Sequence, residues 1–251
     1  MRRIAVIGDS HVSVLRVAHK AGVAGKRAVL RYFVQRSRGT TPLKIARGDA
    51  GLVAEIPEVQ ILAPNNDTLQ LDDFDVVVTI GFGFSVHYLA KLFRHHRSEF
   101  HSDARSTQVL SDRAFHRLAR ATLDHSPAMR FRRLLLDAGA RHVVIQAQPR
   151  VNETIVRSKE GPHLLYRAVT AHGDDARLDD TFSALMAEYA AEGVAVLDQP
   201  AATRVGRVFT ADRWAVEARE PGPRRDYIHM NGDYGALALL QIIEASEALE
   251  V

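Results

Sequence analysis

The sequence predicts an α/β fold in which a doubly wound, parallel, five-stranded sheet carries helices on both faces. Five short apolar runs are each bounded by turn residues, and segments with helical spacing of apolar residues separate them. Two of the runs are β-branched without polar alternation, which is typical of strands covered on both faces. Strands that alternate with helices in this way favour parallel pairing. The predicted strands cover residues 4–7, 28–34, 74–80, 142–145 and 194–197.

The intervening helices are predicted from apolar residues that recur every three or four positions. The first of them is expected to bury one face and to stop at a following glycine, while another opens on a Ser-Asp pair that can cap it. The predicted helices cover residues 12–21, 111–123, 128–138, 181–191 and 235–249. In the first, the expected face is Val14, Val17, Ala18 and Ala21, and Gly22 is the expected stop.

Composition indicates one globular domain spanning residues 1–251. The chain has no cysteine, which excludes thiol catalysis, disulfides and Cys-ligated zinc. The net charge of +3 is small and dispersed, so we expect no nucleic-acid partner. The opening residues run at once into a short apolar strand, and no apolar stretch approaches the ~20 residues of a membrane span. We therefore expect a cytoplasmic protein without membrane contact; its oligomeric state stays open.

Two less regular stretches, residues 37–71 and 202–225, interrupt the alternation. Ligands of open α/β sheets bind beyond the carboxyl ends of the strands, so loops at that edge matter most.

The run Gly8-Asp9-Ser10-His11 stands where the first strand leads into the first helix. A serine there lies at the carboxyl edge of the sheet, close to the unpaired N–H groups and the dipole of a helix N-terminus. That position suits a nucleophile whose substrate develops an oxyanion. The same tetrapeptide is also compatible with ordinary helix capping.

A second motif, Asp226-Tyr227-Ile228-His229, precedes the last predicted helix. An aspartate three residues before a histidine can turn back to the imidazole, fix its tautomer and leave the other nitrogen free as a general base. Taken alone, the pair is also compatible with a surface ion pair or a helix cap. A loop after the fifth strand can return to the edge that carries Ser10.

With these two motifs the sequence resembles the SGNH or GDSL-like hydrolase superfamily, whose fold is flavodoxin-like. The first block matches in Gly8, Asp9 and Ser10, with His11 where better-known members have Leu; the last matches in Asp226, His229 and the 231–235 stretch. The Gly-Asp-Ser-His version points to a branch acting on carbohydrate acyl groups. The resemblance implies Ser10 as nucleophile, His229 as base and Asp226 as the residue that orients it.

The middle of the chain departs from the family pattern. An asparagine of the oxyanion hole is expected after the third strand, where this chain has Gly83. Loss of one such donor costs about 3–4 kcal/mol of transition-state stabilisation. The candidates for the oxyanion hole are the backbone N–H groups of Ser10, Gly39, Gly81 and Gly83, with the 81–83 turn favoured; these glycines are equally compatible with a tight turn against the next helix.

Polar residues near the predicted edge are candidate substrate-binding residues. Gln148 and Asn152 follow the fourth strand and offer side-chain amides. Asp9 is expected chiefly to hold the serine loop. The full set is Asp9, His11, Gln148, Asn152 and Asn231.

Other signals favour plainer interpretations. Twelve histidines include no His-Glu-x-x-His motif, so we expect no metal site. The basic cluster at residues 130–133 is more typical of a solvated helix face than of a phosphate site. Phe209 and Trp214 could either stack on a sugar or cover the sheet edge.

The sequence therefore predicts a serine-dependent acyl-ester hydrolase or acyltransferase, acting on an O-acylated carbohydrate or a similar small ester. It needs no cofactor, although coenzyme A is possible if the enzyme is a transferase. The alternatives are a binding protein or a coenzyme A-dependent sugar acyltransferase without hydrolytic activity, and a nucleotide-binding sheet in which His229 has no role.

Overall fold

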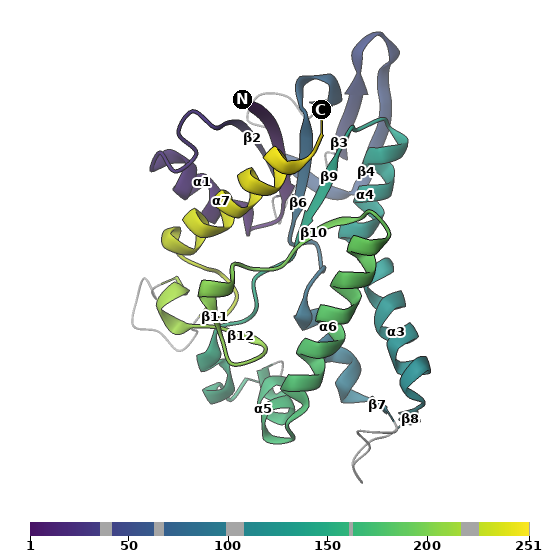
Figure 1. Cartoon of the computed structure of the whole chain (residues 1–251), viewed down its shortest axis with the longest axis vertical. Coiled ribbons are helices and arrows are strands. Elements are labelled where there is room, and N and C mark those ends of the chain that lie inside the picture. The colour runs from purple at the N-terminus through teal and green to yellow at the C-terminus, as the bar shows by residue number, and fades with distance from the viewer. Residues whose placement is uncertain (36–41, 63–67, 99–107, 161–162, 217–225, 251) are drawn as a thin grey trace.

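The fold is that of a three-layer α/β protein in the computed structural model, which describes residues 1–35, 42–62, 68–98, 108–160, 163–216 and 226–250 (Figure 1). Within these residues, a sheet has the strand order β10-β9-β6-β1-β2-β4-β3-β5. The first five strands in that order are parallel, which confirms the predicted fold class. They are β1 Arg2–Gly8, β2 Ala28–Gln35, β6 Val76–Ile80, β9 Val143–Gln146 and β10 Ala195–Leu197.

The sheet extends beyond the prediction on the β2 side, inside the stretch interpreted as irregular. β3 Pro42–Arg47, β4 Gly51–Leu62 and β5 Thr68–Gln70 continue it, with β4 antiparallel to both β2 and β3. β3 gives no clean alternation in the sequence: Lys44 is exposed, but both Ile45 and Ala46 are buried. Pro42 is tolerated because it is the first residue of β3.

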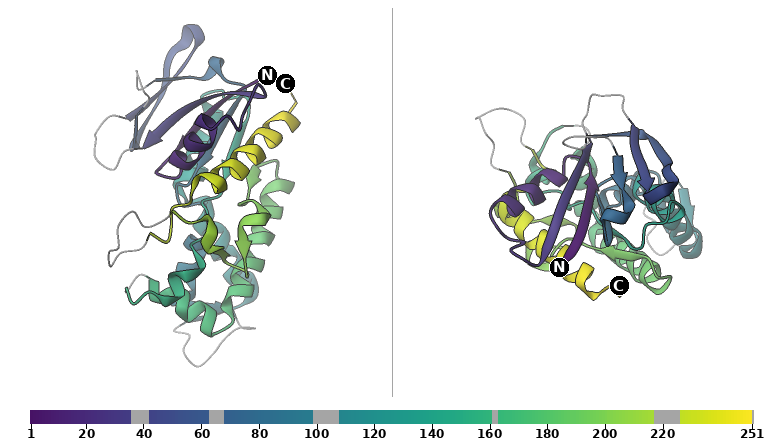
Figure 2. Two further views of the ribbon diagram at one scale, coloured as in Figure 1. Left: turned by 90° about the vertical axis from the view of Figure 1, so that its left-hand side faces the viewer. Right: turned by 90° about the horizontal axis from the view of Figure 1, so that it is seen from above.

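Helices cover both faces of the sheet, as predicted. α1 Val12–Lys20 and α7 Gly232–Ala248 pack side by side on one face, and α4 Pro127–Asp137 lies on the other (Figures 1 and 2). α3 Asp112–Asp124 begins at Ser111, whose side chain caps it by accepting the N–H of Ala114. The remaining described helices and strands are α2 Val86–Ala90, α5 Leu164–Ala171, α6 Asp174–Ala191, β7 His96–Ser98, β8 Gln108–Leu110, β11 Arg204–Val205 and β12 Phe209–Thr210.

Alternate residues of the central strands enter two separate cores. Ala5 and Ile7 of β1 pack with residues of α2 to α6, whereas Ile4 and Val6 pack with residues of α1 and α7. All four are completely buried. A strand buried on both sides needs no polar alternation, which is why these runs could be recognised in the sequence.

The predicted buried face of α1 was partly wrong. Val14 and Ala18 are buried as expected, but Leu15 replaces Val17 in the core and Val17 is 56% exposed. Ala21, also predicted on this face, is exposed and caps the end of the helix. The physical reason is the position of α7, which packs against the Val14 side of α1 and leaves Val17 beside its first residue.

Candidate active site

Ser10 lies in a turn that follows β1 directly and leads into α1. The turn is stabilised by the Asp9 carboxylate, which accepts the backbone N–H of His11 at 3.0 Å and that of Phe82 at 3.2 Å. The carbonyl of Ser10 accepts the hydroxyl of Ser13 at 2.6 Å. Asp9 thus links two loops at the carboxyl edge of the sheet, in agreement with the loop-holding role expected for it.

The His229 loop is stabilised on both sides. One Asp226 oxygen accepts the backbone N–H groups of Ile228 and His229 at 2.9 and 3.0 Å, which forms a tight local turn. On the other side, the N–H of Val216 donates to the carbonyl of His229 at 3.2 Å. The imidazole is thereby presented from a short, doubly anchored segment.

The two loops meet because α1 and α7 begin next to each other. A Cβ atom at Gly235 would lie 2.3 Å from the carbonyl oxygen of Val14, so only glycine permits this approach of the two backbones. Asn231 caps α7 by accepting the N–H of Tyr234, and its side-chain amide donates to the carbonyl of Arg213. Asn231 therefore acts in this structure as a capping residue that fixes the start of α7.

The result is a continuous hydrogen-bonded chain across three side chains. Nε2 of His229 lies 2.6 Å from Oγ of Ser10, and Nδ1 of His229 lies 2.5 Å from Oδ2 of Asp226. Ser10 and His229 lie 219 positions apart in the sequence. In this arrangement the carboxylate accepts Nδ1–H, and the lone pair of Nε2 faces the serine hydroxyl.

Electrostatics keep Asp226 ionised. Partial burial acts to raise its pKa, but the N–H groups of His229 and Ile228 and the His229 ring outweigh it, so the pKa lies below its ordinary value. Its side chain is 43% exposed, so water also contributes to solvating the carboxylate.

The His11 ring packs against the His229 ring in a tilted arrangement, with ring centroids 5.3 Å apart. Its side chain is buried, and burial lowers the pKa of its imidazole, with His229 acting in the same direction and Asp9 and Asp226 opposing it. His11 is thus neutral at pH 7. Because it is only 4% exposed, it packs against the His229 ring and is not accessible to a substrate.

The glycine turn after β6 lies beside Asp9. Gly81 has φ +84°, and a Cβ there would lie 2.4 Å from the Asp9 carboxylate; a Cβ at Gly83 would lie 2.5 Å from the Tyr88 ring. Both glycines therefore have a steric reason to be present. The N–H of Phe82 is taken by Asp9, whereas no described residue accepts the N–H of Ser10, Gly81 or Gly83.

The other predicted residues have different surroundings. Gly39 lies outside the described residues. Asn152 is completely buried: its oxygen accepts from Thr154 and its amide donates to Asp212 at 2.9 Å, so the prediction of a substrate contact is wrong for it. Gln148 is half-buried and follows β9, where its backbone N–H donates to Phe84.

The two aromatic candidates for a sugar platform, Phe209 and Trp214, differ in their burial. Phe209 is buried against Tyr166 in the larger core, so it offers no surface to a sugar. Trp214 is half-buried, with the Arg213 guanidinium 4.9 Å above its ring, and its carbonyl accepts the N–H of Asn231. The backbone of residues 214–216 pairs with that of residues 229–231. The sequence did not indicate this pairing, because backbone hydrogen bonds do not depend on particular residue types.

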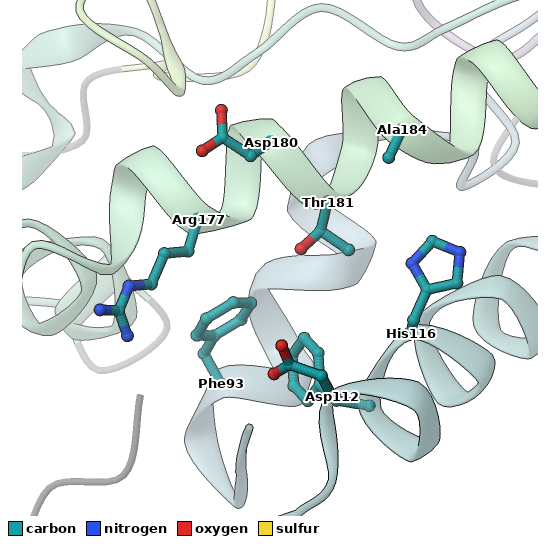
Figure 3. A pocket seen from close by; sticks show the side chains of 8 residues that line it. Phe93, Asp112, His116, Arg177, Asp180, Thr181 and Ala184 are labelled. Atoms are coloured by element: carbon teal, nitrogen blue, oxygen red, sulfur yellow. The ribbon is translucent and has the colours of Figure 1, made fainter. Parts of the chain in front are cut away.

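A cavity of about 260 Å³ lies between α3 and α6, away from Ser10 and His229 (Figure 3). Asp112 and His116 reach it from α3, and Arg177, Asp180 and Thr181 from α6. None of its lining residues belongs to the predicted site. Among the described residues no three metal-ligating side chains converge, and no helix there is long and apolar enough to cross a membrane.

Comparisons with known proteins give structural neighbours only: no family model and no curated protein matches the chain. An extracellular lipase from Streptomyces rimosus is 13% identical with a TM-score of 0.46, over 98% of this chain and 100% of that chain. A candidate acylhydrolase from Bacteroides fragilis is 10% identical with a TM-score of 0.40, over 98% of this chain and 86% of that chain. Both TM-scores lie below 0.5, so neither neighbour supports an inference about this chain.

Proposed function

We propose that the chain is a serine-dependent acyl-ester hydrolase or acyltransferase of the SGNH type, acting within a single domain of residues 1–251. The observation that carries the proposal is the chain of hydrogen bonds from Ser10 through His229 to Asp226, at 2.6 and 2.5 Å. A nucleophile, a base and an ionised orienting group in this order support acyl transfer.

In the proposed reaction, Oγ of Ser10 forms a bond to the acyl carbonyl carbon while its proton moves to Nε2 of His229. The Asp226 carboxylate holds Nδ1–H and stabilises the imidazolium. When the tetrahedral intermediate collapses, the ester C–O bond breaks and the leaving alcohol takes the proton from Nε2. Water or an acceptor hydroxyl then attacks the acyl-serine by the same steps in reverse, which restores Ser10.

The developing oxyanion needs donors, and the backbone N–H groups of Ser10, Gly81 and Gly83 are the candidates without an acceptor among the described residues. Because this turn lacks the asparagine side chain, we expect a slower hydrolase than a site that has this additional donor. Transfer of the acyl group to a bound acceptor hydroxyl passes through the same tetrahedral intermediate and is tested alongside hydrolysis, with acyl-coenzyme A or an acylated carbohydrate as the donor.

The test is labelling of the purified protein by a fluorophosphonate, followed by peptide mass spectrometry. We expect the label on Ser10, with its rate reduced at least a hundredfold in His229→Ala, because the serine hydroxyl is then no longer deprotonated. Label elsewhere, or no label together with no turnover of an aryl acetate, would refute the hydrolase. Thermal shifts with coenzyme A separate the transferase, because a ligand that binds the native state raises Tm. Cytoplasmic location stays a prediction.

A further inference from the structure

A groove of about 570 Å³ runs along α1 and begins at Ser13. One wall is α1 itself, and the other is made by the paired segments 214–216 and 229–231 with the first residues of α7. Its lining residues are Ser13, Val14, Val17, Val216, Met230, Asn231, Gly232 and Asp233.

The groove lies next to both reacting residues of the proposed function, although neither of them lines it. Ser13, Val14 and Val17 follow Ser10 by three, four and seven positions, the spacing that places side chains on one face of a helix. Ser13 also hydrogen-bonds the Ser10 carbonyl, and Met230 directly follows His229. A group attached to a carbonyl held at Ser10 has this groove beside it.

The chemistry of the lining favours an uncharged apolar occupant. Val14 and Met230 form an apolar floor that is 6% and 4% exposed, and Val17 keeps 56% of its surface open at the wall. Asp233 is the one charged side chain among the described lining residues, so a phosphate or carboxylate would meet repulsion there. The volume lies within the range of small-molecule sites, about 300–1,000 Å³, and exceeds the need of an acetyl group.

We propose that this groove binds the acyl chain of the substrate and selects acyl groups of about six to eight carbons over acetyl. The inference rests on the proposed function, because it places the acyl carbonyl at Ser10. Each fully buried methylene raises kcat/KM about fourfold, and a methylene that is half-buried in an open groove raises it about twofold. From acetyl to hexanoyl, kcat/KM should therefore rise roughly tenfold to a hundredfold.

The kinetic test compares p-nitrophenyl acetate, hexanoate and octanoate. In Val17→Asp the ratio of hexanoate to acetate kcat/KM should fall at least tenfold, because a charge replaces an apolar contact. Leu134→Asp, a change at another partly exposed apolar residue of a helix, should leave the ratio within twofold. An unchanged ratio in Val17→Asp, or a gain that follows the alcohol chain of hexyl acetate rather than the acyl chain, would overturn the inference.

A binding test keeps the groove separate from catalysis. Ser10→Ala should bind octanamide, a neutral analogue of the acyl part, with a rise in Tm that Val17→Asp in the same background removes. If Ser10 is labelled and esters are hydrolysed but octanamide does not bind, the inference fails and the proposed function stands. If octanamide binds and Ser10 is never labelled, the proposed function fails while the apolar groove is supported.

Discussion

Replacing Asp226 with asparagine should invert the tautomer of His229 without unfolding its loop. In the native chain one carboxylate oxygen accepts two backbone N–H groups at 2.9 and 3.0 Å, and the other accepts Nδ1–H at 2.5 Å. An asparagine keeps the two backbone bonds through its carbonyl oxygen and turns an NH₂ group toward Nδ1. The proton then resides on Nε2, facing the serine, and the base is lost.

The expected loss follows from this inversion. The same change lowers kcat about 10⁴-fold in the Ser-His-Asp triad of serine proteases, and the 43% exposure of the Asp226 side chain allows water to replace part of its effect. For Asp226→Asn we therefore expect a fall in kcat on the order of 10³- to 10⁴-fold, or about 4–5 kcal/mol in activation free energy. Because the backbone bonds persist, stability should change by no more than about 1 kcal/mol.

The assay is hydrolysis of an aryl ester at saturating substrate, with urea unfolding in parallel. Asp137→Asn, an exposed change at the end of α4, serves as the control and should keep kcat within twofold. If Asp226→Asn retains a tenth or more of the wild-type kcat, the carboxylate does not set the tautomer and the reasoning is wrong. If it loses several kcal/mol of stability, the loop depends on the carboxylate in a way that two retained hydrogen bonds do not explain.

Three further changes test other parts of the structure. Gly81→Ala puts a Cβ 2.4 Å from a carboxylate oxygen at φ +84°, so urea unfolding should show a loss of about 1–3 kcal/mol, and unchanged stability would contradict the described turn. Arg150→Met removes a completely buried guanidinium that contacts Asp179 at 2.6 Å, while Arg204 still contacts this carboxylate at 2.8 Å; we expect a loss of about 2–3 kcal/mol by denaturant titration, against at most about 1 kcal/mol for the exposed Arg27→Met. In the wild type, the lowered pKa of His11 means that the unfolded chain takes up a proton first as pH falls below about 6.5, so stability should decrease there by up to about 1.4 kcal/mol per pH unit. His11→Leu should lack this slope between pH 7.5 and 5, and a slope equal to that of the wild type would show that His11 is not the group responsible.

The parallel part of the sheet was predictable because its strands are apolar on both sides. The side chains of Ile4 to Ile7 pack alternately into the two cores, and a run that is apolar at every position has few other structural interpretations. The β3–β4–β5 extension was missed because Pro42 and Pro57 lie within it and because adjacent Ile45 and Ala46 are both buried, so that no alternating pattern marks it. Val17 was placed in the core because helical spacing gives the face of a helix only to within a residue or two, and the neighbouring α7 decides which side is covered.

The sequence by itself determined the fold class, the positions of the central strands along the chain and the two motifs that carry Ser10 and His229, because apolar periodicity and local turns are properties of nearby residues. Tertiary structure decided how those motifs meet: the close approach at Gly235, the pairing of 214–216 with 229–231, and the 2.6 Å contact between residues 219 positions apart. It also showed that the side chains of Asn152 and Asn231 cap helices, Asn152 in the interior and Asn231 in the wall of the groove. Contacts between distant segments depend on packing geometry, which residue spacing in one chain does not contain.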